Sequence, residues 1–137
     1  MTTLTTFAQV EKAIVDRFAT MWEGRNLPYA LENDGFEPDA NTAWALLLFR
    51  YASNRNLAIG QVTRKQRQGV FIAQIHAPKN TGVKQMTELE DAIIAEFESH
   101  TRTGQVKFSD QVPTRIGIRE EWLRSDVSII FRWDHHA

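Results

Sequence analysis

The chain has 137 residues, of which 42% are apolar and 24% are charged, and its formal net charge is −1. This length fits one domain with its own core, and the near-neutral charge gives no general preference for nucleic acid. The absence of cysteine excludes disulfides, cysteine nucleophiles and cysteine zinc sites. The longest apolar run, 43–49, is too short for a membrane helix, and no signal peptide is evident, so we expect no membrane partner.

The first predicted element is an amphipathic helix over about residues 6–23. Its apolar residues follow each other at spacings of three and four, which is typical of one helix face. They are Phe7, Val10, Ile14, Phe18 and Met21. Thr6 and Gln9 fit a capping box at the start of this helix, and Gly24 fits its C-terminal end.

A long acidic segment, 28–41, separates this helix from the next element. It carries a glycine, two prolines and four acids with no base, which predicts an ordered loop with a short strand at Tyr29–Leu31. Residues 42–52 then predict a strand with apolar side chains on both faces. One face holds Trp44, Leu46 and Leu48, and the other holds Ala45, Leu47, Phe49 and Tyr51. Such a strand is either covered on both sides or contributes one face to a subunit contact.

The remaining pattern predicts further strands around a second helix. Before the second helix we expect a turn at 53–56, a strand at 57–63, a basic hairpin tip at 64–69 and a strand at 70–77. The helix itself is predicted at about 83–100. After it we expect short strands at 105–108 and 114–118, and a final strand that ends near Trp133 and extends back to Glu121. This order predicts an α+β fold in a single domain, 1–137, with a mostly antiparallel sheet of about five to six strands. Two main helices pack on one face of that sheet.

The sequence contains no recognisable catalytic motif. Patterns for phosphate-binding loops, serine hydrolases, zinc proteases and calcium loops do not occur. His76 and His100 lie at the ends of a predicted strand and a predicted helix, where local packing or helix-end charge explains them better than a metal. Asp134, His135 and His136 are adjacent at the chain end and cannot form a rigid closed site. We therefore expect no enzyme activity, no cofactor and no metal.

Charged residues are unevenly distributed along the chain. Residues 60–79 carry four bases and no acid, whereas residues 28–41 and the second helix are acidic. The helix acids, which we expect to be solvated, are Glu88, Glu90, Asp91, Glu96 and Glu98. Two different, complementary patches favour a head-to-tail contact, which closes into a ring when the rotation allows it. Two alternative interpretations of the basic cluster are an exposed hairpin tip kept soluble by its charge and a nucleic-acid contact. No aromatic residues are interleaved with the cluster, as single-strand binding would favour.

Beyond the single elements, short motifs follow each other in a particular order. They are Pro28-Tyr29-Ala30-Leu31-Glu32-Asn33, Phe36-Glu37-Pro38, the strand containing Trp44, Arg67-Gln68-Gly69-Val70, Pro78-Lys79-Asn80-Thr81-Gly82, and a final strand from near Trp122 to Trp133. This order covers nearly the whole chain and resembles the tail terminator proteins of long-tailed bacteriophages, also called tail completion or minor tail proteins. The matching residues are loop positions and not a catalytic signature.

The resemblance implies a structural virion protein, made in the host cytoplasm, that forms a ring, usually a hexamer, at the head-proximal end of the tail. The ring would stop polymerisation of the tail tube and provide the surface for head–tail joining. Its partners would be its own copies, the major tail tube protein and a head-completion or neck protein. DNA would pass through the ring without specific binding. Candidate residues of the subunit or tail-tube interface are Asn33, Phe36, Trp44, Arg64, Lys65 and Arg67.

Three alternatives remain open from the residues alone. Another neck or head–tail adaptor protein would have much the same composition, and its binding partner would distinguish it. A small-molecule-binding α+β domain would need a deep pocket with converging polar groups. A nucleic-acid-binding module would show steeply salt-dependent retention on DNA that is lost when Arg64–Arg67 is neutralised.

Overall fold

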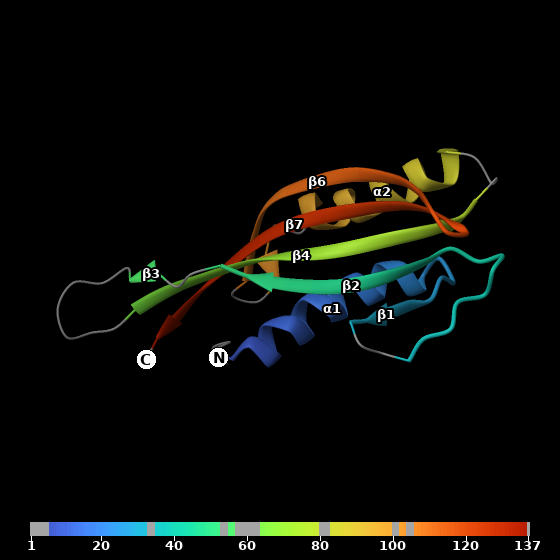
Figure 1. Ribbon diagram of the computed structural model, residues 1–137. Helices are drawn as coiled ribbons and strands as arrows, with labels where there is room; N and C mark the ends of the chain where they lie inside the picture. The colour runs from blue at the N-terminus through green and yellow to red at the C-terminus, as the bar shows by residue number, and fades with distance from the viewer. Residues whose placement is uncertain are drawn as a thin grey trace.

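A mixed seven-stranded sheet forms the centre of the protein (Figure 1). The computed structural model describes residues 6–32, 35–52, 55–56, 64–79, 83–99, 102–103 and 106–136. Its elements are α1 (Phe7–Glu23), β1 (Tyr29–Leu31), β2 (Trp44–Tyr51), β3 (Arg55–Asn56), β4 (Arg64–Pro78), α2 (Val83–Ser99), β5 (Arg102–Thr103), β6 (Val106–Arg119) and β7 (Trp122–His136). The strand order is β1-β2-β4-β7-β6-β5, with β3 also paired to β4. Only β1–β2 is parallel, so the predicted α+β fold with a mostly antiparallel sheet is confirmed.

The first helix begins and ends as its sequence predicts. The Thr6 hydroxyl accepts from the Gln9 backbone N–H at 3.1 Å, and the Gln9 side-chain oxygen accepts from the Thr6 N–H at 3.2 Å. This capping box pairs two backbone donors that a helix start leaves unpaired. At the other end Gly24 is the C-cap, and the buried Trp22 indole donates to the Pro28 carbonyl at 2.8 Å. That bond ties the end of α1 to the segment that enters β1.

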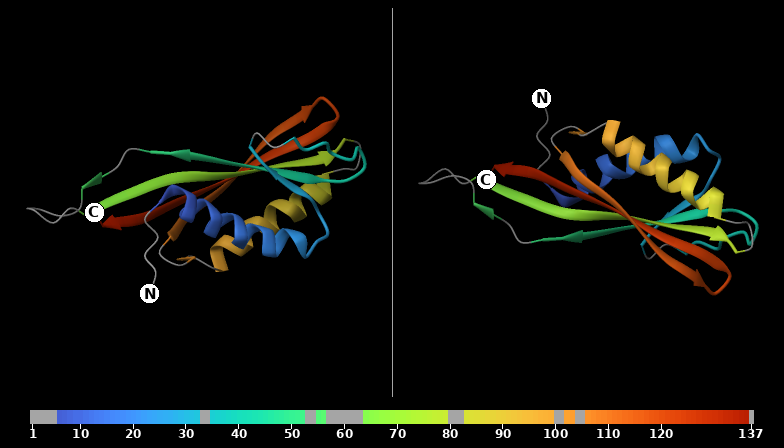
Figure 2. Two further views of the ribbon diagram at one scale, coloured as in Figure 1. Left: turned by 90° about the horizontal axis from the view of Figure 1, so that it is seen from below. Right: turned by 90° about the horizontal axis from the view of Figure 1, so that it is seen from above.

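Both helices lie on the same face of the sheet (Figure 2). Phe71 of β4 shows this most directly, because its ring lies 5.9 Å from that of Phe18 in α1 and 5.9 Å from that of Phe97 in α2. Side chains alternate along a strand, so every second residue of the long strands enters this one core. The buried strand residues include Ala45, Leu47, Phe71, Ala73, Ile75, Val127, Ile129 and Phe131. The remaining set of side chains points to the opposite face.

The predicted hairpin tip at 64–69 is wrong, because these residues are part of a continuous strand. β4 pairs with β7 without interruption from Arg64↔His136 to Pro78↔Trp122. The predicted turn at 53–56 is also wrong at its second half, since Arg55–Asn56 form β3 against β4. The first residues of β4 belong to the part of the β4–β7 ribbon that extends beyond the helices (Figures 1 and 2). Residues 64–68 are all polar, so no apolar alternation marks them as a strand. The predicted strand at 57–63 lies outside the described residues.

The two short strands predicted near 105–108 and 114–118 belong to one long strand, β6. Its pairing with β7 shifts register between Phe108 and Gln111 and again between Arg115 and Gly117. Each irregularity breaks the alternation on which sequence recognition of a strand depends. Gly117 has a φ of +96°, which a residue with a side chain rarely adopts.

We expect Gly69→Ala to lower the free energy of unfolding by about 1–3 kcal/mol, as overpacking of a close contact does. A Cβ at Gly69 would lie 2.6 Å from the Arg50 carbonyl oxygen and 2.9 Å from Cζ of Phe131. The matched control is Gly35→Ala, where a Cβ meets nothing within 4 Å. Urea unfolding followed by tryptophan fluorescence measures both, and equal midpoints for the two variants would contradict the prediction.

Candidate interaction surfaces

The sheet face opposite the helices carries a stripe of apolar side chains that no described helix covers. Its members, here called the apolar stripe, are Leu46, Leu48, Val70, Ile72, Val112 and Ile130. Ile130 is 37% exposed and Val112 is 51% exposed. Figure 1 looks onto this face, with α2 behind β6 and β7. An antiparallel sheet that faces water on one side usually carries polar residues there, so the stripe indicates a contact surface.

Charged residues flank the apolar stripe. Near one end Arg124 forms a two-bond ion pair with Asp126, with the first bond at 2.9 Å. Beside β2, Arg50 forms a similar pair with Glu32, with both bonds at 3.1 Å. Charges arranged around an apolar centre are typical of protein–protein interfaces, where they fix register more than affinity.

An aromatic cluster closes one end of the uncovered face and contains two of the predicted interface residues. The Trp44 indole stacks on the His76 imidazole with 4.2 Å between ring centroids, and the Phe36 ring lies 5.1 Å from that of Trp44. Trp122 packs edge-on against both stacked rings. Burial and the nearby Arg124 guanidinium lower the pKa of His76 to about 4, against a smaller opposing effect of Asp126. His76 is therefore a neutral packing residue at neutral pH.

The other predicted interface residues do not join this cluster. Asn33 lies outside the described residues. Arg64 and Lys65 occupy the first two positions of β4, between β3 and β7. The Arg67 guanidinium lies 4.9 Å from the centre of the Phe7 ring in a cation–π contact, so this arginine packs against α1 and is not at an exposed tip.

A groove that sequence reasoning missed lies between α1 and the edge of β2. Its volume is about 520 Å³. Its lining includes Ala8, Glu11, Lys12, Val15, Asp16, Leu31, Glu32, Leu47 and Phe49. Three large apolar side chains in or beside this groove, Phe7, Leu31 and Tyr51, are each 39% exposed. No sequence motif predicts the groove, because it forms only where α1 packs beside a sheet edge.

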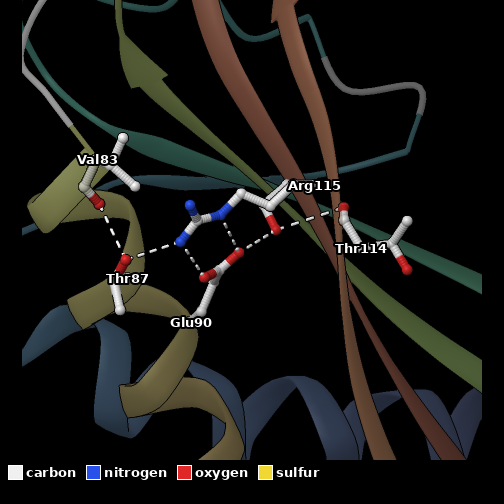
Figure 3. A network of polar contacts seen from close by, with 6 residues as sticks. Val83, Thr87, Glu90, Thr114 and Arg115 are labelled. Carbon is white, nitrogen blue, oxygen red and sulfur yellow. Dashed lines mark hydrogen bonds and ion pairs between the residues drawn. The ribbon is translucent and has the colours of Figure 1, made fainter.

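A buried carboxylate holds α2 against the sheet (Figure 3). Glu90 is 6% exposed and accepts from Nε and Nη2 of Arg115 at 3.0 and 2.7 Å, and also from the Ser125 hydroxyl. Arg115 also donates to the Thr87 hydroxyl at 2.7 Å, which in turn donates to the Val83 carbonyl. The expectation that Glu90 is solvated is therefore wrong. Burial acts to raise the pKa of Glu90, but hydrogen bonds from Arg115 and Ser125 outweigh it and lower the pKa.

Nowhere in the described ranges do three His, Asp or Glu side chains gather in a way that could hold a metal ion. Neither described helix is long and apolar enough to span a bilayer.

Comparison with known proteins gives one family match. Residues 9–133 match the model of the family described as "Phage tail terminator protein". No curated protein matches the chain. Fifteen chains of solved structures match. One of them is 17% identical in sequence to this chain, and the match covers 90% of this chain and 94% of that one with a TM-score of 0.63. At that identity the likeness shows the fold alone.

We expect Glu90→Gln to destabilise the protein by about 1–3 kcal/mol, because hydrogen bonds to a charged group are lost in a buried place. A carboxyl whose pKa is lowered by folding stabilises the fold above its ordinary pKa of 4.5 and loses that contribution as the pH falls through the folded pKa. The free energy of unfolding, measured with urea at pH values from 7 to 3, should therefore fall more steeply with pH for the wild type than for Glu90→Gln.

The matched control for this experiment is Glu88→Gln, which neutralises an exposed carboxylate on the same helix. We expect its stability to stay within about 0.5 kcal/mol of wild type. Parallel acid profiles for the wild type and Glu90→Gln would show that the Glu90 network does not couple folding to pH.

Proposed function

Because the chain belongs to the phage tail terminator protein family, we propose that it caps the head-proximal end of the tail tube and stops its polymerisation there. The protein is a structural component of a phage tail, in a family that acts by assembly and not by catalysis. The proposed cap is a ring of copies, a hexamer, that also presents the surface for joining the head. Its partners are the major tail tube protein and a head-completion protein.

The apolar stripe is the observation that supports this proposal most strongly. Leu48, Ile72 and Ile130 lie on neighbouring strands of a face that the described helices leave uncovered. A protein that worked alone in water would gain nothing from such a face, whereas a protein built into a tail buries it. We propose that the tube end covers the stripe, with the Arg124–Asp126 pair at the rim of the contact.

The buried polar groups of the described residues support a structural role over a catalytic one. Glu90 and Ser125 are the buried polar residues among them. The Ser125 hydroxyl donates to Glu90, which also accepts from Arg115. General acid catalysis needs a carboxyl whose pKa is raised, but here the pKa of Glu90 is lowered. DNA passing through the ring would require a channel wall without net positive charge, so we place the basic start of β4 away from the channel.

The proposal predicts that a charge in the apolar stripe abolishes capping while the protein stays folded. Ile130→Asp and Val112→Asp place a carboxylate at positions that are 37% and 51% exposed, so folding tolerates it, but an interface would have to desolvate it. Electron microscopy of tail tubes assembled with each variant should show tubes longer than those capped by the wild type.

The matched control is Val83→Asp, at a residue that is 53% exposed on α2 and thus on the helix side of the molecule. This variant should cap normally. Circular dichroism establishes that all three variants are folded. Tubes of uncontrolled length in the presence of the wild-type protein itself would refute the terminator function.

A further inference from the structure

The groove between α1 and β2 lies along an incompletely paired sheet edge. Parallel pairing with β1 ends at Leu31↔Leu47, followed by one further bond from the Glu32 N–H to the Leu47 carbonyl. β2 continues for four residues, to Tyr51, and no other described strand pairs with its outer side there. Because backbone groups alternate in direction along a strand, Phe49 and Tyr51 direct their backbone N–H and C=O groups to this outer edge. One of these groups, the Phe49 carbonyl, already accepts from the Arg50 guanidinium at 2.8 Å. The groove thus combines an apolar floor with an edge that can accept an extended chain.

The rim of the groove is acidic. Three carboxylates, Glu11, Asp16 and Glu32, line it together with a single ammonium group, that of Lys12. Lys12 pairs with Asp16 at 2.7 Å, and Arg50 beside the groove pairs with Glu32 at 3.1 Å. The excess negative charge is therefore that of Glu11, which accepts a hydrogen bond from the Tyr51 hydroxyl. A ligand for this groove should therefore be apolar at its centre and basic at its flanks.

One segment of this same chain has that composition. Residues 57–63, Leu-Ala-Ile-Gly-Gln-Val-Thr, contain Leu57, Ile59 and Val62 and no charge. Arg55 precedes the segment and Arg64-Lys65 follow it, with no acid between Arg55 and Arg67. The apolar and β-branched residues favour an extended conformation. We propose that residues 57–63 of one copy dock into the groove between α1 and β2 of the next copy.

The fold makes the neighbouring copy, and not the same molecule, the source of this segment. Pairing of Arg55↔Gln66 and Asn56↔Lys65 places the described residues that flank the segment at the outer end of the β4–β7 ribbon. That end extends beyond the helices, away from the body of its own molecule (Figures 1 and 2). A tip on one copy and a groove on the next form a head-to-tail contact, which is the type that closes into rings. The inference rests on the proposed function, because it supplies the contact between copies in the ring.

The absence of cysteine from the chain allows a direct test by disulfide formation. Ala8→Cys places a thiol in the groove, and Ala58→Cys places one in the docking segment. The two single variants are mixed, one of them carrying an affinity tag that gives the mixed dimer its own mobility. The mixture is oxidised both in solution and on capped tails, so a ring that forms only on the tube is tested as well. Docking should give roughly tenfold more mixed dimer than a random encounter does.

The matched control pairs Ala58→Cys with Asp91→Cys, an exposed residue on α2 outside the groove. The double variant Ala8→Cys/Ala58→Cys should form a ladder of linked chains on a non-reducing gel. Mixed dimer no more abundant than in the control, or a double variant that links only within single molecules, would overturn the inference. The tube-length experiment separates the two proposals, because a protein that caps tubes but fails this test closes its ring through another surface.

Discussion

The central constraint on this structure is that its sheet carries apolar side chains on both faces, while both of its helices cover the same one. Phe71 faces the helices and touches Phe18 and Phe97, whereas its neighbour Ile72 points to the uncovered side. Burying apolar surface is the main favourable contribution to folding and association alike. What the chain does not bury by folding is available for association, and part of that surface, at Val112 and Ile130, lies on the uncovered face.

The Glu90 network complements this constraint by fixing how α2 lies on the sheet. Apolar packing tolerates small shifts of a helix along the sheet. The Glu90 carboxylate, by contrast, can accept hydrogen bonds from both Arg115 and Ser125 in only one position of α2. Arg115 belongs to β6 and Ser125 to β7, so a single side chain sets the helix relative to two strands. We infer that this group contributes more to the uniqueness of the fold than to its total stability, as buried ion pairs do in some proteins.

Much of the fold could be predicted from the sequence, and the failures have physical causes. The helices were predictable because Thr6 and Gln9 form a recognisable capping box at the start of the first, and because apolar residues at helical spacing indicate both. The start of β4 was not predictable, since strands in a ribbon beyond the core have no reason to alternate apolar and polar residues. Of the candidate site, Phe36 and Trp44 do come together, but Arg67 packs on Phe7, a contact that no local pattern reveals. The groove depends on how α1 packs beside a sheet edge, so no sequence pattern could predict it.

One detail of β6 bears on how an assembling protein avoids runaway aggregation. Beyond Lys107, no other described strand pairs with the outer side of this long strand, and such an edge is a template for adding further chains without limit. Pro113 cannot donate a backbone hydrogen bond, and the two register shifts bend the strand away from a straight edge. A molecule that we propose to end a polymer thus carries, in its own sheet, chemistry that discourages it from starting one.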